Sequence, residues 1–174
     1  EETGLAVGLH QRPSLEDALR ARALLLEQGE LAPVLEAMGW SLDLDRLVGF
    51  ARWRPKHREI RVFDTRFYLA DLGTGAVELL VDDTENTHLF WASAEEALSL
   101  ADSGEIKVIF PTRRNLERLA QFGNFDEAVS HVAEYPVRMV TPFMEMRDGE
   151  PWLAIPADAG YPVTGERLES AARG

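Results

Sequence analysis

The 174-residue sequence contains no cysteine, no long apolar run and no excess of basic residues. The absence of cysteine excludes disulfide bonds and thiolate catalysis. No apolar run approaches the roughly 18 residues that a membrane-spanning helix needs, and no signal peptide is visible, so no membrane partner is predicted. A cytoplasmic location is predicted, because a reducing compartment is compatible with this composition.

Negative charge is what the chain has in excess, with 30 acidic residues against 18 basic ones and a formal net charge of -12. Such a surface repels a nucleic-acid backbone, so no nucleic-acid polymer is predicted as a partner. A phosphorylated small molecule is still compatible, because a divalent cation can screen its charge locally. The hydrophobic content of 45% fits one globular domain with a sizeable core.

The N-terminal third predicts a short buried strand over 5–9, followed by two helices. Ser14 is typical of an N-cap and opens a helix that runs to about residue 28. A second helix is predicted over 31–38, and a glycine follows each of the two. Together these helices form an excursion between two strands.

The middle of the chain predicts three strands, over 47–53, 60–72 and 88–92, and a further short one over 77–81. In the second of them, Phe63 and Phe67 fall on one face and Arg66 on the other. Trp91, in the third, is expected in the core in preference to a base-stacking position.

The last third begins with a capping box, in which Ser93 and Glu96 open a helix. Thr112 is expected to cap the next helix, with an apolar stripe at Leu116, Leu119 and Ala120. Another helix is predicted over 125–133. A final hairpin is predicted from 137–146 and 151–155 around Asp148-Gly149, and the last dozen residues read as a loose tail. Strands and helices in this order predict an α/β layered domain.

The first five residues carry a chemical pattern, Glu1-Glu2-Thr3-Gly4-Leu5. Adjacent carboxylates at a helix end, then glycine and an apolar residue, match the closing portion of the Nudix box, G-x5-E-x7-R-E-U-x-E-E-x-G-U, where U is aliphatic. Hard oxygen ligands suit Mg²⁺ or Mn²⁺, which polarise phosphate oxygens. Taken alone, the same residues also fit a solvated acidic terminus.

Four further segments resemble the Nudix hydrolase superfamily, and in particular the subgroup that includes the peroxisomal coenzyme A diphosphatases. They are Phe50-Ala51-Arg52-Trp53, Phe63-Asp64-Thr65-Arg66-Phe67-Tyr68-Leu69-Ala70, Glu85 with Trp91 and Ser93-Ala94-Glu95-Glu96-Ala97-Leu98, and Pro111-Thr112 with Leu116. Their order along the chain is that of the subgroup. The first part of the box, with its Arg-Glu pair, is not in this sequence, so the resemblance implies a chain that starts in its own catalytic helix.

The resemblance implies a Nudix-type α/β/α sandwich with a mixed sheet and an inserted helical excursion, in which the N-terminal strands are missing. The implied organisation is a single domain over 1–165, incomplete at its N-terminus, with the insertion at about 12–45 and a tail over 166–174.

The implied activity is metal-dependent hydrolysis of a diphosphate linkage in a nucleoside diphosphate-X substrate, with coenzyme A or an acyl-coenzyme A as the first candidate. Glu1, Glu2 and Glu85 are the implied metal ligands for Mg²⁺ or Mn²⁺, and Glu2 and Glu85 the implied catalytic carboxylates. Arg52, Lys56 and Arg66 are candidate substrate-binding residues, because a guanidinium binds phosphate bidentately.

Each candidate also has a plainer interpretation that the sequence leaves open. Glu85 fits a solvated acidic loop with Asp82 and Asp83, and Arg66 fits an ion pair with Asp64 or with another acidic residue. Arg52 and Lys56 fit a solvated basic turn. For the whole chain the alternative is a catalytically incomplete Nudix-fold binding or oligomerisation module, and a homodimer is one assembly compatible with either role.

Overall fold

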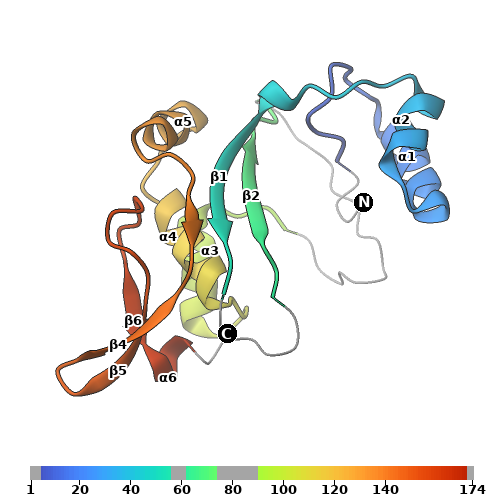
Figure 1. Ribbon diagram of the computed structural model, residues 1–174. Coiled ribbons are helices and arrows are strands. Elements are labelled where there is room, and N and C mark those ends of the chain that lie inside the picture. Colours follow the sequence, from blue (N-terminus) through green and yellow to red (C-terminus); the bar gives the residue numbers. More distant parts are fainter. Residues whose placement is uncertain (1–4, 56–61, 74–89, 172–174) are drawn as a thin grey trace. The chain divides into compact units, whose positions relative to one another are not determined.

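The computed structural model of the chain describes residues 5–55, 62–73 and 90–171. It contains helices and two small sheets, so the protein is of the mixed α/β class, as predicted (Figure 1). Its contacts divide it into an N-terminal unit, Glu1–Val48 with Leu69–Trp91, and a C-terminal unit, Gly49–Tyr68 with Ala92–Gly174. The single Nudix-fold domain over 1–165 stays a prediction.

Two helices, α1 (Leu15–Gln28) and α2 (Leu31–Met38), pack against each other in the N-terminal unit (Figure 1). The Ser14 hydroxyl accepts a hydrogen bond of 3.1 Å from the Asp17 backbone N–H and so caps α1. Each helix ends at a glycine in the left-handed region, Gly29 at φ 72° and Gly39 at φ 65°. Both predicted helices are confirmed.

The core of the N-terminal unit contains Leu9, Ala21 and Val34, each less than a tenth exposed. The predicted strand over 5–9 is wrong for all but its last residue, because only Leu9 forms a bridge, an isolated antiparallel one with Leu42. A short 3-10 helix, η1 (Leu44–Arg46), follows.

One sheet has the strand order β2-β1-β3, formed by β1 (Leu47–Trp53), β2 (Thr65–Ala70) and β3 (Met139–Val140). β3 runs parallel to β1, so these two residues are not part of the final hairpin in which they were predicted. Strand β2 is shorter than the predicted 60–72. Phe63 lies before it and is 63% exposed.

Three helices follow in the C-terminal unit, α3 (Ala94–Ser103), α4 (Phe110–Leu119) and α5 (Phe125–Glu134). The predicted capping box is confirmed at α3, where the Glu96 backbone N–H donates to the Ser93 hydroxyl at 3.1 Å and the Ser93 N–H donates to the Glu96 carboxylate at 2.7 Å. The predicted cap at Thr112 is wrong, because α4 begins earlier and has Pro111 in its first turn. Proline suits that turn because its missing N–H would have no partner in the helix.

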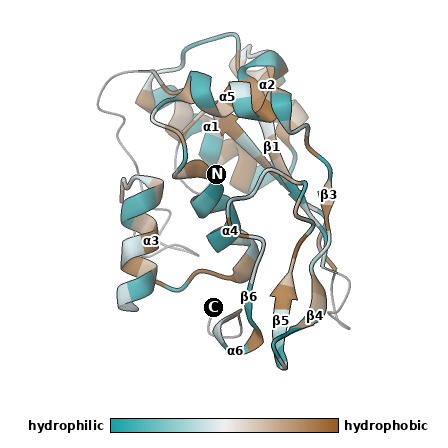
Figure 2. Cartoon of the chain, turned by 90° about the vertical axis from the view of Figure 1, so that its left-hand side faces the viewer, coloured by the Kyte–Doolittle hydropathy of each residue, from teal (hydrophilic) through white to brown (hydrophobic). Residues whose placement is uncertain are grey.

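The second sheet is antiparallel and consists of β4 (Phe143–Arg147), β5 (Glu150–Ala154) and β6 (Gly165–Arg167), with β5 between the other two (Figure 2). The predicted Asp148-Gly149 turn joins β4 to β5, and both of its residues have positive φ. Helix α6 (Leu168–Ala171) follows β6. Residues 166–171, predicted as a loose tail, are therefore part of a strand and a helix.

Trp53 is at the centre of the core of the C-terminal unit and is 1% exposed. Its ring makes edge-to-face contacts with Phe110, at a centroid distance of 6.1 Å, and with Tyr161, at 5.7 Å. Trp91, by contrast, is 60% exposed, so its predicted place in a core is wrong. Among the described residues, no helix is both long and apolar enough to cross a bilayer.

Close packing at Gly160 generates a prediction about stability. Gly160 has φ 76°, and a Cβ built there would lie 2.8 Å from Tyr135 Cγ. Gly104 has a similar φ of 80°, with no atom within 4 Å of its Cβ position. Gly104→Ala should therefore lower the free energy of unfolding by about 1 kcal/mol through backbone strain alone. Gly160→Ala should lower it by about 1 to 3 kcal/mol more, because overpacking is added. Urea denaturation measures both, and equal losses would contradict the packing at Gly160.

Candidate functional site: an arginine cluster around Asp64

Four of the residues predicted to act on substrate or metal lie outside the described residues: Glu1, Glu2, Lys56 and Glu85. The other two, Arg52 and Arg66, lie on β1 and β2 of the same sheet. Their surroundings decide what this part of the chain can bind.

Arg52 forms a two-pronged ion pair with Asp64, just before β2. Its Nε lies 2.8 Å from Asp64 Oδ1 and its Nη2 lies 2.6 Å from Oδ2. Both side chains are about one-third exposed. A planar guanidinium and a carboxylate fit each other in this way, so the contact fixes both groups. Asp64, a candidate partner of Arg66, therefore forms its ion pair with Arg52.

Two more arginines act on the same carboxylate. The hydrogen bonds from Arg52 are the main reason that the pKa of Asp64 lies below its ordinary value, and the positive charges of Arg52, Arg66 and Arg54 lower it further. Partial desolvation opposes these effects. Three guanidinium groups around one carboxylate leave two positive charges in excess. The residues Arg52, Arg54, Asp64 and Arg66 are called the arginine cluster below.

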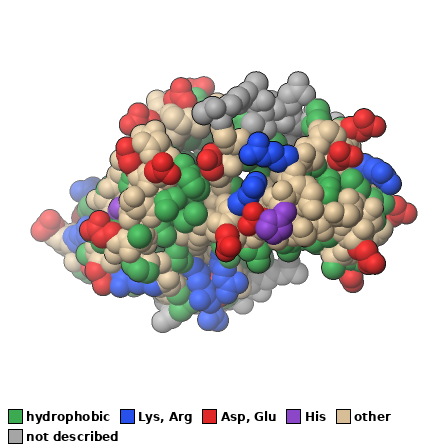
Figure 3. Space-filling view, turned by 90° about the horizontal axis from the view of Figure 1, so that it is seen from above, with side chains coloured by type: hydrophobic (Ala, Val, Ile, Leu, Met, Phe, Trp, Pro, Cys, Tyr) green, Lys and Arg blue, Asp and Glu red, His purple; other side chains and the backbone are tan. Residues whose placement is uncertain are grey.

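This positive site is unusual in a chain of net charge -12. Acidic side chains are spread over the face of the molecule seen in Figure 3. Within the described part of the chain, neither Arg54 nor Arg66 forms an ion pair, and both side chains are exposed. The cluster can therefore offer unsatisfied guanidinium donors to an anion.

Alternation along β1 explains why Arg52 points outward. Trp53, the next residue, is buried, and successive side chains of a strand point to opposite faces. The Trp53 indole Nε1–H donates to Asn115 Oδ1 at 3.1 Å and to Tyr161 Oη at 3.0 Å, and the Tyr161 hydroxyl donates to Asn115 Oδ1 at 3.0 Å. This triad fixes β1 against α4, and with it the direction of Arg52.

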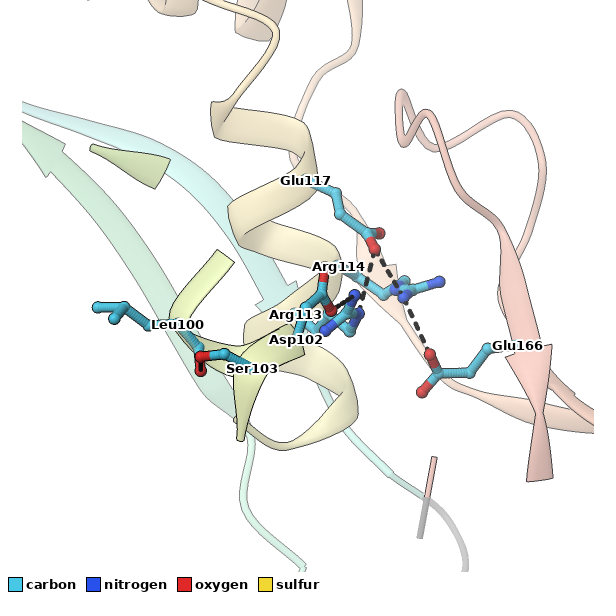
Figure 4. Close-up of polar contacts among 7 residues, drawn as sticks. All are labelled: Leu100, Asp102, Ser103, Arg113, Arg114, Glu117 and Glu166. Carbon is cyan, nitrogen blue, oxygen red and sulfur yellow. Dashed lines mark hydrogen bonds and ion pairs between the residues drawn. The ribbon is translucent and has the colours of Figure 1, made fainter. Parts of the chain in front are cut away.

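The buried face of α4 carries charge as well. Arg114 and Arg118 are 1% and 2% exposed. Arg114 Nη2 lies 2.8 Å from Glu117 Oε1 and 3.2 Å from Glu166 Oε2, which ties α4 to β6 (Figure 4). Arg118 Nη1 donates to the Phe50 carbonyl of β1 at 2.8 Å. The guanidinium of Arg118 also lies 4.5 Å from the centre of the Phe50 ring.

Burial makes these groups harder to charge. It lowers the pKa of both Arg114 and Arg118, and it raises the pKa of Glu117 in spite of the nearby arginines. Within the described ranges, these buried polar atoms of α4 have no hydrogen-bond partner: Arg114 Nε, Asn115 Nδ2, Glu117 Oε2, Arg118 Nε and Arg118 Nη2. Because the side chains of Arg114 and Arg118 are almost fully buried, we assign this network to structure.

Sequence reasoning missed both groups of residues in part. It selected Arg52 and Arg66 but not Arg54. On α4 it predicted an apolar stripe at Leu116, Leu119 and Ala120, whereas the buried residues are Phe110, Arg114, Asn115 and Arg118. A four-residue spacing of polar side chains is ordinarily typical of a solvated face, so the sequence carried no signal for their burial.

The described residues contain no group of three or more His, Cys, Asp or Glu side chains placed to hold a metal ion. The predicted ligands Glu1, Glu2 and Glu85 lie outside them. Hollows do lie elsewhere among the described residues. One, of about 180 Å³, is apolar and lies in the N-terminal unit between α1, α2 and residues 5–9. Another is a shallow surface around α5.

Comparison with protein-family models, curated proteins and solved structures gives no match for this chain.

The ion pair at the centre of the arginine cluster generates a prediction about pH. Arg52→Met should raise the pKa of Asp64 toward its ordinary value, because it removes the hydrogen bonds that lower it most. In the unchanged protein the Arg52–Asp64 ion pair is intact above the ordinary pKa of a carboxyl group. It is lost as the pH falls through the lowered pKa of Asp64. A ¹³C NMR titration of the Asp64 carboxyl group measures the change. Arg54→Met is the matched control and should shift the pKa less. Equal shifts in the two variants would contradict the geometry.

Proposed function

We propose that the chain belongs to a metal-dependent hydrolase of the Nudix type, which cleaves a diphosphate linkage in a nucleoside diphosphate-X substrate, and that the arginine cluster binds the substrate's phosphates. One observation carries the proposal. The cluster joins two of the segments that resemble that superfamily, residues 50–53 on β1 and 63–70 on β2, through the Arg52–Asp64 ion pair.

Other local features support the same proposal. The segment 93–98, which follows the Nudix pattern, opens α3 through its capping box. The segment around Pro111 opens α4, which packs on β1 through Arg118. We extend the proposal to the fold: a Nudix-type α/β/α sandwich in which β2-β1-β3 is part of the central sheet and α1 and α2 belong to an inserted excursion.

The arginine cluster would hold the phosphates by charge and hydrogen bonds. Arg52 is already engaged by Asp64, which holds it in place. Arg54 and Arg66 form no ion pair with the described residues, and their N–H donors suit phosphate oxygens, which is the pairing that guanidinium geometry favours. Charge-assisted bonds of this kind orient a diphosphate and hold its phosphorus atoms in a fixed place.

The carboxylates Glu1, Glu2 and Glu85 have the donor chemistry that suits Mg²⁺ or Mn²⁺, since both ions prefer hard oxygen ligands. When bound, such an ion supplies charge stabilisation at the phosphate oxygens. We assign Glu2 the role of accepting the proton of the attacking water. The water oxygen then bonds to phosphorus as the bond to the leaving phosphate breaks.

The test is a hydrolysis assay on the full-length protein with Mg²⁺ and three substrates: coenzyme A, an acyl-coenzyme A and a nucleotide sugar. Glu2→Gln and Glu85→Gln should each lower kcat by roughly 100-fold or more, because each removes a carboxylate that acts at the reacting centre. Asp83→Asn, in the same acidic stretch of the sequence as Glu85, is the matched control and should leave kcat within about twofold. Arg66→Gln should raise KM by roughly tenfold, because it removes a charged phosphate contact.

Two outcomes would count against the enzyme. Turnover that is unaffected by Glu2→Gln and Glu85→Gln would contradict the catalytic roles proposed for these two carboxylates. Binding of a diphosphate without turnover, weakened by Arg66→Gln, would support the alternative of a Nudix-fold binding module.

A further inference from the structure

Strand β4 lies at the edge of the second sheet and has no neighbouring strand on its outer side within the described part of the chain. It also exposes large apolar side chains, with Met144 48% exposed and Met146 67% exposed. An open strand edge with apolar side chains is a site at which another strand can pair. The partner depends on which backbone groups and side chains the edge presents.

The turn fixes which backbone groups face outward. Arg147 and Glu150 are directly opposite each other and flank the two-residue turn Asp148-Gly149. The pair that flanks such a turn exchanges backbone hydrogen bonds, and hydrogen-bonded residues alternate along the strand. Glu145 and Arg147 therefore direct their N–H and C=O groups toward β5. Met144 and Met146 direct theirs to the open edge.

Antiparallel pairing of β4 with a second copy of itself can be centred on only a few residues. Centring on Glu145 would place glutamate opposite glutamate, and centring on Arg147 would place arginine opposite arginine, which is unfavourable in both cases. Centring on Met144 would place Pro142 opposite Met146, and proline has no N–H for that hydrogen bond.

Centring on Met146 avoids these conflicts and pairs residues 145–147 of the two copies, up to the start of the Asp148-Gly149 turn. It places Glu145 of each copy opposite Arg147 of the other, so that opposite charges meet at two places related by the two-fold axis. It places the two Met146 residues opposite each other, with outward backbone groups that bond mutually. The sequence of β4 is thus complementary to itself in one register.

We propose that two copies of this chain form a homodimer by antiparallel pairing of β4 with β4, with the two-fold axis at Met146. The two three-stranded sheets then form one continuous six-stranded sheet, and the exposed methionines cover each other. Glu145 and Arg147 pair within the strand at 2.6 Å in a single copy, and side-chain rotation redirects them across the axis. This surface is independent of the arginine cluster and does not depend on the proposed activity.

A cysteine crosslink tests the register directly, because the chain has no cysteine of its own. Under mild oxidation, Met146→Cys should give a disulfide-linked dimer, since residues opposite each other in a hydrogen-bonded pair have Cα atoms about 5.5 Å apart. Met144→Cys is the matched control on the same face of the same strand. Its two copies would lie roughly 14 Å apart and should not crosslink. Equal crosslinking of the two variants, or none at position 146, would overturn the proposal.

Charge reversal tests the pairing in solution, with mass measured by light scattering across a concentration series. The unchanged chain should have twice the mass of one copy at high concentration. Glu145→Arg and Arg147→Glu should each raise the dissociation constant about tenfold, because each opposes like charges at two places. The double variant should restore it to within about threefold. Circular dichroism checks that all variants fold. A monomer at every concentration, or a double variant no better than the single ones, would overturn the proposal.

Discussion

The burial of the Trp53 indole is the constraint on which the C-terminal unit depends. An indole N–H that is removed from water needs an acceptor, because leaving it unpaired costs about 1 to 3 kcal/mol. Asn115 of α4 and Tyr161, from the segment between β5 and β6, both supply one. The same Tyr161 hydroxyl donates to Asn115, so three separate parts of the chain meet at one closed set of hydrogen bonds. Arg118 strengthens the link between α4 and β1 by donating to the Phe50 carbonyl.

This buried side of β1 determines what its other side can do. Because Trp53 points inward, its neighbour Arg52 points outward, where Asp64 holds it in a two-pronged ion pair. Arg54 and Arg66 then add charge that no described acidic side chain neutralises by contact. A positive site on an acidic protein suits a compact anion, and a diphosphate is the anion that the resemblance of the chain implies. The buried core on one face and the exposed arginine cluster on the other are thus two consequences of one strand.

Local patterns in the sequence predicted much of the fold. Caps at Ser14 and Ser93, the glycines after α1 and α2, and the Asp148-Gly149 turn were predicted correctly, because each depends on a few neighbouring residues. Long-range pairing was not predictable in this way. Met139–Val140 pairs with β1 and not within the final hairpin, and β6 and α6 replace a predicted tail.

The buried face of α4 was not predicted, because arginines spaced four residues apart are typical of a solvated helix face. Their burial is tolerated because carboxylates and aromatic rings contact them in the folded chain. For the site, the chain's own residues suggested Arg52 and Arg66, whereas Arg54 joined them only through the geometry of the sheet.

Hydrogen exchange at the Trp53 indole N–H, followed by NMR, tests the central constraint most directly. If the indole, Asn115 and Tyr161 form the closed set of hydrogen bonds described above, the N–H should exchange only when the whole C-terminal unit unfolds. Its opening free energy should then equal the global free energy of unfolding from urea denaturation. An opening free energy well below the global value would mean that β1 separates from α4 in the folded protein, and would contradict the account.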